Sequence, residues 1–202
     1  MLIFENSRYI LLLMLVQSFE FIQTKQCNIP EDNEDIDWDK LHDDWYDGLT
    51  DDAGMTTDFL GGKLENFTKT STGVQYVIIE LNKNSPARTT SLHMTKQRAG
   101  VYRPEKSEEA AVLALEALKP DGSINEKAMK IDEALFGGDI LILSDEKNYM
   151  IHAFCSLEDE WVVWATFPTL NPTIQQISLM WNKLIEKGII VQLYPYETVG
   201  HP

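Results

Sequence analysis

The stretch from Ile140 to Leu170 constrains the fold most, because it places three short runs that favour β-strand in immediate succession. These runs are Ile140 to Leu143, Tyr149 to Cys155 and Trp161 to Phe167, and they are rich in Ile, Val, Trp and Tyr. Short polar connections separate the runs, which indicates antiparallel neighbours. The sequence therefore predicts a β-meander, and we expect the upstream chain to supply further strands of the same sheet.

A helix is predicted directly after the meander, from Asn171 to Gly188. Asn171 is a suitable N-cap, Pro172 suits the first helical position, and Gly188 suits the position just beyond the end. One apolar stripe is expected to pack on the outside of the sheet. Its members are Ile174, Ile177, Trp181, Leu184 and Ile185.

Upstream, the segment from Lys63 to Arg103 favours β-structure, most clearly at Val74 to Leu81. The segment Ser107 to Leu118 fits either a helix capped by Ser107 or a strand entering a hairpin, and periodicity does not separate the two. Ser123 to Leu135 is polar with scattered apolar residues, and Ile189 to Leu193 is expected to add a last short strand. The length of 202 residues favours a single domain.

Residues 1–18 are typical of a secretory signal peptide. Arg8 lies in the n-region, Tyr9 to Val16 forms an apolar core, and the mature chain would begin near Phe19. The apolar run is too short to span a bilayer as a helix. The alternative is an N-terminal hydrophobic strand or anchor. We therefore expect a secreted, extracellular protein whose single domain covers residues 19–202.

In a secreted protein, the cysteines and one asparagine of this sequence are predicted to be modified. Cys27 and Cys155 are the only cysteines, and in an oxidising compartment an even number favours a disulfide over two free buried thiols. Asn66, followed by Phe67 and Thr68, is the only acceptor sequence for N-glycosylation and is predicted to be exposed.

The charge balance limits the possible partners. The sequence has 32 acidic against 17 basic residues, a net charge of −15, which disfavours binding to nucleic acid and to anionic membranes and leaves cationic ligands open. The acidic run Asp35 to Asp39 resembles the start of a calcium loop, but Lys40 and Tyr46 stand where that loop needs Gly and Glu. A solvated acidic face is the simpler interpretation, and no metal site is predicted.

The sequence contains none of the strong catalytic or cofactor motifs, such as HExxH, GxSxG, a P-loop, GxGxxG or CxxC. The four histidines lack the spacing of metal ligands. They are His42, His93, His152 and His201. We therefore predict a binding protein rather than an enzyme, with no cofactor.

In order along the chain, these elements resemble the lipocalin family. Ile36 to Leu49 resembles the first lipocalin motif, a helical turn followed by GxWY, with Trp45 and Tyr46 in register. Ser144 to Tyr149 resembles the second motif, and Trp164 to Leu170 the third. The positions of the two cysteines resemble the apolipoprotein D and insect bilin-binding branch, which suggests a divergent arthropod-type member.

This resemblance implies an all-β fold, an eight-stranded antiparallel up-and-down barrel with a C-terminal α-helix packed outside. The sequence departs from the motifs at Asp43 in place of Gly, Glu146 in place of Tyr and Thr166 in place of the Arg that packs on the tryptophan of the first strand. The segment Arg88 to Leu135, expected to supply the third to fifth strands, resembles the family only faintly.

Strand alternation then predicts which side chains point into the barrel. Trp45 and Thr166 are expected at its base. The positions that line the ligand cavity are predicted by assuming that the Trp45 side chain points into the barrel and the Cys155 side chain points out of it. These positions are Asp47, Leu49, His152, Phe154, Val162 and Trp164.

Three functions are consistent with this pattern. The first is a secreted carrier or scavenger of a small hydrophobic molecule such as a lipid, pigment or odorant. The second is capture of biogenic amines, as in salivary lipocalins, with Asp47 as a candidate carboxylate. The third is an extracellular interaction protein whose barrel is filled by its own side chains.

Overall fold

A computed structural model describes residues 27–31, 33–51, 59–83, 86–105, 123 and 126–196. The predicted signal peptide and the ambiguous segment Ser107 to Leu118 lie outside these residues. No helix within the described ranges is long and apolar enough to cross a bilayer.

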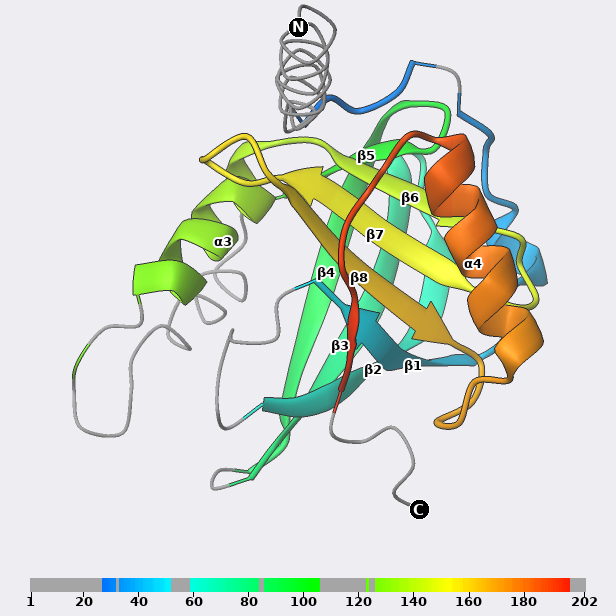
Figure 1. The fold of residues 1–202 in the computed structure, drawn as a ribbon, viewed down its shortest axis with the longest axis horizontal. Coiled ribbons are helices and arrows are strands. Elements are labelled where there is room, and N and C mark those ends of the chain that lie inside the picture. Colours follow the sequence, from blue (N-terminus) through cyan, green and yellow to red (C-terminus); the bar gives the residue numbers. More distant parts are fainter. Residues whose placement is uncertain are drawn as a thin grey trace, which may run out of the picture.

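The described chain forms the predicted antiparallel barrel (Figure 1). Neighbouring strands pair in sequence order from β2 to β8, and β1 closes the barrel by pairing with both β8 and β2. A ninth, two-residue strand pairs with β1. The strands are β1 (Asp44–Thr50), β2 (Phe59–Lys69), β3 (Gly73–Asn82), β4 (Arg88–Arg98), β5 (Val101–Pro104), β6 (Ile140–Ser144), β7 (Met150–Cys155), β8 (Trp161–Phe167) and β9 (Tyr194–Pro195).

The meander predicted from the sequence is β6, β7 and β8. Both of its faces are buried: one lines the barrel interior, and the other is covered by helix α4 (Ile174–Glu186). Burial on both sides explains why these strands are nearly continuous apolar runs rather than alternating ones. The meander therefore joins the two hydrophobic clusters of the molecule.

Helix α4 is where predicted, but its N-terminus and buried face differ from the prediction. The N-cap is Thr173, whose side chain accepts a bond from the Gln176 backbone in a capping box, so Asn171 and Pro172 precede the helix. Ile174 and Ile185 are 85% and 65% exposed. Ile174 lies at the end of the helix and Ile185 is turned about 100° from Leu184. The side chains packed on the sheet are Ile177, Met180, Trp181 and Leu184.

Two other expectations about the chain are corrected. The third to fifth strands are β3, β4 and β5, so Arg88 to Leu135 supplies only the last two of them, and Glu126–Gly137 forms helix α3 instead. Helix α3 packs against β5 and β7 at one end of the barrel and buries Ile131, Ala134 and Leu135. The last strand is β9 rather than Ile189 to Leu193, because the pairing with β1 begins only at Tyr194.

The end of the barrel opposite α3 is sealed by aromatic rings instead of the motif arginine. The 3₁₀ turn η1 (Trp38–Lys40) inserts Trp38, whose Nε1 donates to Tyr102 Oη at 3.0 Å. The ring of Trp38 also stacks on Phe67 with centroids 5.9 Å apart. We call this the closed end.

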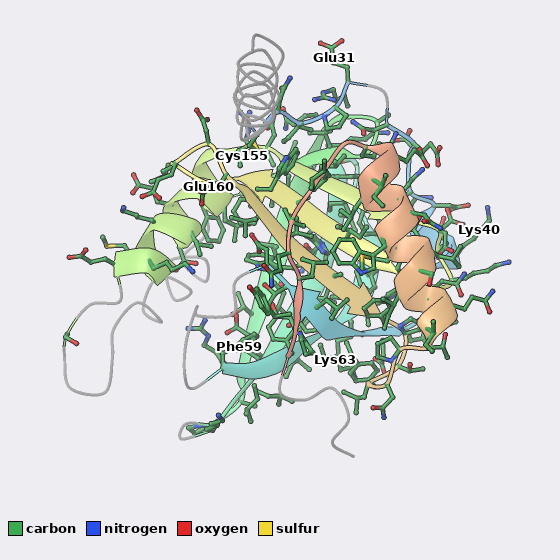
Figure 2. All side chains as sticks on the ribbon, viewed as in Figure 1. Glu31, Lys40, Phe59, Lys63, Cys155 and Glu160 are labelled. Atoms are coloured by element: carbon green, nitrogen blue, oxygen red, sulfur yellow. A yellow bond between two sulfur atoms is a disulfide. The ribbon has the colours of Figure 1, made fainter. Side chains whose placement is uncertain are left out.

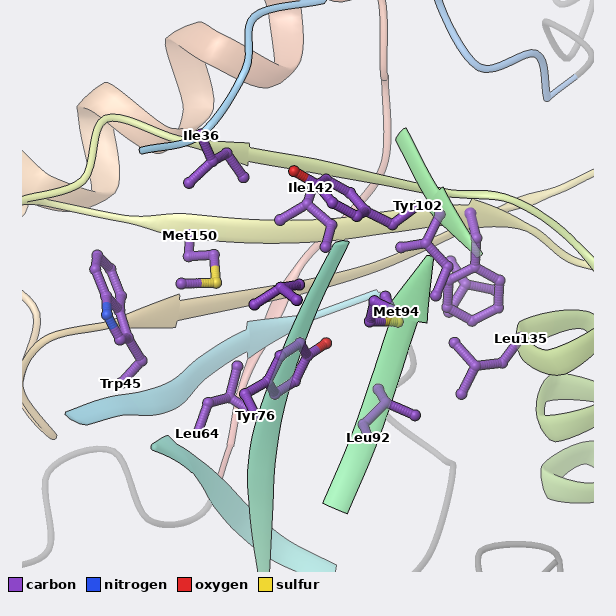
Figure 3. Packing of buried hydrophobic residues seen from close by; sticks show 14 of the residues in the cluster. Ile36, Trp45, Leu64, Tyr76, Leu92, Met94, Tyr102, Leu135, Ile142 and Met150 are labelled. Atoms are coloured by element: carbon purple, nitrogen blue, oxygen red, sulfur yellow. The ribbon is translucent and has the colours of Figure 1, made fainter. Parts of the chain in front are cut away.

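Trp45, expected at the base, is fully buried in the interior cluster with Met150 and Leu64 (Figure 3). The Thr166 hydroxyl, in the place of the arginine, donates to the Met150 carbonyl at 3.3 Å. Glu146, also a departure from the motif, accepts a bond from the backbone N–H of Asp37 at 2.9 Å and so ties η1 to the β6–β7 turn.

The predicted disulfide between Cys27 and Cys155 is present. Cys155 ends β7, near the α3 end of the barrel (Figure 2). The Cys27 backbone N–H also donates to the Asp159 carbonyl at 3.0 Å. These bonds anchor the N-terminal segment outside the barrel before it runs to η1.

We predict that the disulfide is a major part of the stability, because it closes a loop with a sequence separation of 128 residues. The chain-entropy model gives about 5 kcal/mol for such a loop. A Cys27→Ala/Cys155→Ala double variant should unfold at clearly lower urea concentration than the oxidised wild type. Reductant should lower the wild-type midpoint and leave the variant unchanged; equal midpoints for the two proteins would contradict the prediction.

Candidate functional site

The barrel encloses a cavity of about 110 Å³. Residues from seven strands, from α3 and from the segment after β9 contribute to its wall. Among the residues that the structure describes, the lining is mostly apolar, with three carboxylates, one histidine and no lysine or arginine. The lining residues are Asp47, Phe59, Leu64, Tyr76, Ile78, Glu80, Leu92, Asp132, Leu135, Ile140, His152, Trp164, Thr166 and Tyr196.

Strand β3 shows how the cavity is organised along its length. Tyr76, Ile78 and Glu80 occupy alternate positions and all line the cavity. Tyr76 lies nearer the β2–β3 turn at the closed end, and Glu80 lies nearer the α3 end. The cavity is therefore polar at both ends and apolar between them.

Strand register brings the acidic side chains together at the α3 end. Gly62 on β2 pairs with Glu80 on β3, and Glu80 pairs in turn with Arg88 on β4. Asp47 on β1 reaches the same row, because the Gly62 backbone N–H donates to its carboxylate. A Cβ atom at Gly62 would lie 2.8 Å from Asp47 Oδ2, so a glycine here makes room for the carboxylate.

The orientation of Asp47 depends on a bulge in β1. The pairing of β1 with β8 shifts between Asp47 and Leu49, and Gly48 takes the extra position. A side chain at Gly48 would overlap the Phe167 ring, with a Cβ 2.4 Å from it. The bulge turns Leu49 outward into the cluster beneath α4, so the expected inward direction of Leu49 is wrong.

Asp132 reaches the cavity from α3, which turns its helical face of Ile131, Ala134 and Leu135 to the interior. Its Oδ2 atom is buried and has no hydrogen-bond partner among the described residues. Glu80, by contrast, is paired: Arg88 donates to its Oε2 through Nε at 3.0 Å and Nη2 at 2.7 Å. We refer to Asp47, Glu80 and Asp132 as the cavity carboxylates.

Crowding of these groups raises two pKa values. Removal from water, and then the nearby Glu80 charge, raise the pKa of Asp47 to about 7. The same two causes raise the pKa of Asp132 to about 7, although Arg88 opposes them. Around neutral pH each of these carboxyls is close to half protonated, so a ligand that binds there can shift their ionisation.

The opposite end of the cavity holds a buried polar pair, Tyr76 and His152. The Tyr76 hydroxyl and His152 Nε2 are 3.1 Å apart, and the two side chains are 1% and 5% exposed. Burial lowers the pKa of His152 to about 4 and raises that of Tyr76. Both groups are therefore neutral at physiological pH. We call them the floor pair.

The C-terminal segment completes the wall where β1 and β2 separate. Pro195 and Tyr194 of β9 pair with Leu49 and Thr50 of β1. The next residue, Tyr196, donates its backbone N–H to the Gly48 carbonyl at 3.1 Å. Its ring meets Phe59 edge to face with centroids 5.5 Å apart (Phe59 is labelled in Figure 2).

Comparison with known proteins bears on this architecture. No protein-family model matches the sequence, and no curated protein matches it either. Solved structures do match. Per a 4, a major allergen from cockroaches, is 12% identical with a TM-score of 0.55, over 85% of this chain and 94% of that one. The chain has the lipocalin fold.

Two other arthropod lipocalins show the same similarity. Insecticyanin from the tobacco hornworm Manduca sexta is 10% identical with a TM-score of 0.56, over 84% of this chain and 85% of its own. The amine binding protein of Rhodnius prolixus, solved as a tryptamine complex, is 13% identical with a TM-score of 0.52, over 88% of this chain and 89% of that one.

The lipocalin cavity includes four of the residues singled out from the sequence. Asp47, His152, Trp164 and Thr166 line it. Phe154 and Val162 belong to the interior cluster and are not among the lining residues. Phe154 packs edge to face on Trp164 with centroids 5.1 Å apart. Across the described ranges, no cluster of three or more His, Cys, Asp or Glu side chains is arranged to hold a metal ion.

Sequence reasoning missed several lining residues. Period-two alternation in Val74 to Leu81 was a usable signal for Tyr76, Ile78 and Glu80. Asp132 required α3 to be recognised, and Tyr196 depends on a two-residue pairing that leaves no local pattern.

We predict that Asp47 costs stability at neutral pH. Its folded pKa lies above the unfolded value of 3.8, so the folded protein holds the proton more tightly. The stabilisation that the protonated Asp47 gives to the folded state is fully present below about pH 4 and is lost as the pH rises through 7. Asp47→Asn, which can still accept from Gly62, should gain on the order of 2 to 4 kcal/mol at pH 8 and little at pH 4.

Urea unfolding at both pH values measures this effect. The pKa of Asp132 is also raised, so the unfolding free energy of the variant should still depend on pH, but less steeply than that of the wild type. Asp43→Asn, at an exposed position, is the matched control and should follow the wild type. A wild-type pH profile unchanged by Asp47→Asn would contradict the prediction.

Proposed function

We propose that the protein is a secreted carrier or scavenger that binds a small organic amine inside its barrel. The observation that carries this proposal is the acidic end of the cavity, where Asp47, Glu80 and Asp132 line a wall to which none of the described lysines or arginines contributes. Arg88 neutralises one of the three charges through Glu80. An ammonium group would supply the missing positive charge.

The physical chemistry of these groups favours a cation. A carboxylate removed from water loses hydration that only a counter-charge or hydrogen bonds can replace. The Oδ2 atom of Asp132 has neither a protein donor nor exposure to solvent. An ammonium ion carries three donors and no acceptor, so it can bond to Asp132 and Asp47 together.

The remainder of the cavity suits an apolar body of limited size. Ile78 lies between Tyr76 and Glu80 on β3. Leu92 and Trp164 pair with Tyr76 and His152 and line the wall beside the floor pair. A volume of about 110 Å³ is below the roughly 150 Å³ of an engineered cavity that binds benzene. This volume disfavours a long lipid and limits the buried part of a ligand to about one ring.

The comparison with solved structures supports the same ligand class at the level of the fold. The amine binding protein of Rhodnius prolixus was solved with tryptamine. At 13% identity this likeness extends to the fold alone, so the proposal depends on the carboxylates of this chain.

A second candidate function is transport of a neutral hydrophobic molecule such as an odorant. It is favoured by the mostly apolar lining and by the pKa values of Asp47 and Asp132 near 7, which allow both groups to be protonated in mildly acidic fluid. The third candidate, a barrel filled by its own side chains, is disfavoured by the cavity itself.

We predict that phenethylamine binds more tightly than propylbenzene, its neutral isostere, in calorimetric titrations at pH 8. Asp47→Asn and Asp132→Asn should each weaken amine binding about tenfold or more, because each removes a charged partner, and should leave propylbenzene nearly unchanged. Asp35→Asn is the control, since Asp35 pairs with Lys96 outside the cavity. Lowering the pH to 5.5 should also weaken amine binding, because both carboxyls gain a proton.

Equal affinities for the two ligands, unaffected by pH and by both substitutions, would instead favour the neutral carrier. If neither ligand binds, the results would favour the alternative in which the barrel is filled by its own side chains.

We also propose that the secreted chain is glycosylated at Asn66. The residue is exposed, lies at a bulge in β2 with a φ of 59°, and its carbonyl accepts from the Thr68 hydroxyl. Expression in a secreting eukaryotic cell should give a heterogeneous mass that endoglycosidase collapses. Asn66→Gln should remove this heterogeneity, and an identical mass for variant and wild type would contradict the proposal.

A further inference from the structure

The outward side of α4 and the residues just after it carry the most exposed large apolar side chains of the described chain. Ile174 and Ile185 belong to the helix, and Ile190, which is 80% exposed, follows it. Apolar side chains scattered singly over a surface are ordinary, whereas a contiguous group of them marks a contact site. The position of these isoleucines relative to one another therefore decides what they indicate.

Helical geometry places two of them on one stripe. Ile174 and Ile185 are eleven residues apart, which is about three turns, or roughly 16 Å along the axis. Exposed Ser178 and half-buried Trp181 lie between them on the same side, and the successive spacings of four, three and four residues are those of a coiled-coil seam. We call Ile174, Ser178, Trp181 and Ile185 the outer stripe.

The end of the helix brings Ile190 beside this stripe. Gly188, with a φ of 71°, donates its N–H to the Ile185 carbonyl, and Ile189 donates its N–H to the Leu184 carbonyl, each at 2.9 Å. This is a Schellman motif, in which the residue beyond the glycine packs back on the helix. Ile189 is accordingly fully buried, and Ile190 is turned outward.

The N-terminal segment lies on the opposite flank of α4. Lys183 is about 180° around the helix from Ile174, and its Nζ contacts Glu34 Oε1 at 3.5 Å. Helix α4 itself lies on the outside of the barrel (Figure 1). The outer stripe is therefore open to a second molecule.

The outer stripe is complementary to a second copy of itself. In an antiparallel helix pair about a twofold axis, Ile174 faces Ile185 of the second copy, and Ser178 faces Trp181 of the second copy. The small serine leaves room for the indole ring, and Ile190 extends the contact at each end. A parallel pair would set two indole rings against each other and leave a gap between two serines.

Charge favours the same surface. The chain has a net charge of −15, so two copies repel each other over most of their surfaces. The four side chains of the outer stripe are all uncharged. A contact made there removes no like charges from water, which a contact between acidic faces would have to do.

We propose that two copies of this chain associate through the outer stripe and Ile190, as an antiparallel pair of α4 helices. Helix α4 is about 20 Å long, and one stripe of it covers less than the roughly 800 Å² per partner of a standard interface. The dimer is therefore weak and forms at high protein concentration. Neither cavity takes part, because α4 packs on the outer face of the sheet.

Sedimentation equilibrium at neutral pH measures this association. The wild type should dimerise with a dissociation constant on the order of 10 to 100 µM, as expected of a small interface. The constant should be lower in about 0.5 M than in about 0.05 M NaCl, because salt screens the repulsion between the two copies.

Ile174→Glu and Ile185→Glu should each raise the dissociation constant about tenfold or more, because each brings a charge into the contact. Both isoleucines are exposed, so both variants should keep the wild-type urea midpoint. Leu157→Glu is the matched control, an exposed leucine in the β7–β8 turn, and should dimerise as the wild type does.

Single cysteines test the register. An equimolar mixture of Ile174→Cys and Ile185→Cys chains should form disulfide-linked dimers under mild oxidation, whereas either variant alone should not. The native Cys27 and Cys155 are already paired with each other. A wild type that stays monomeric at millimolar concentration, a dimer unaffected by both glutamate substitutions, or cross-linking of either cysteine variant to itself would overturn the proposal.

Discussion

The closure of the barrel depends on a short seam. Strands β1 and β2 pair only from Asp44 to Tyr46 before they separate. Beyond that point the bulge at Gly48 redirects β1, and β9 takes up the edge that β2 has left. Asp47 lies where the strands part, with Gly62 donating to it from the other side. The seam thus determines where the cavity wall is polar and where the C-terminal segment attaches.

At the closed end, departures from the lipocalin motifs have structural roles. Thr166, in the position of the motif arginine, bonds to the backbone of β7, and Trp38 fills the base with Tyr102 and Phe67. An aromatic plug needs no buried cation and therefore no compensating carboxylate. Among the described residues, the carboxylates that line the cavity are Asp47, Glu80 and Asp132, and none of them belongs to this plug.

The sequence was sufficient for the β-meander, the approximate position of α4 and the disulfide, because β-prone residue runs, helical periodicity and cysteine count are local signals, and the barrel followed from the resemblance to the lipocalin motifs. It failed where a distant contact decided the outcome. Leu49 points outward because β1 has a bulge at Gly48, where the Phe167 ring of β8 leaves no room for a side chain. Asp132 reaches the cavity only because α3 packs against β5 and β7. The amphipathic pattern of α3 was too weak to predict a helix from the sequence.

The charge of the interior links stability to binding. A barrel built only to be stable would not place Asp47 and Asp132 near Glu80, since the charge of Glu80 and removal from water both raise the cost of ionising these two carboxyls. Such strain is expected where a site is prepared for a ligand that the empty protein lacks. A cation bound there stabilises the ionised carboxylates, and by linkage their deprotonation stabilises the complex. Affinity and pH sensitivity then follow from one arrangement of side chains.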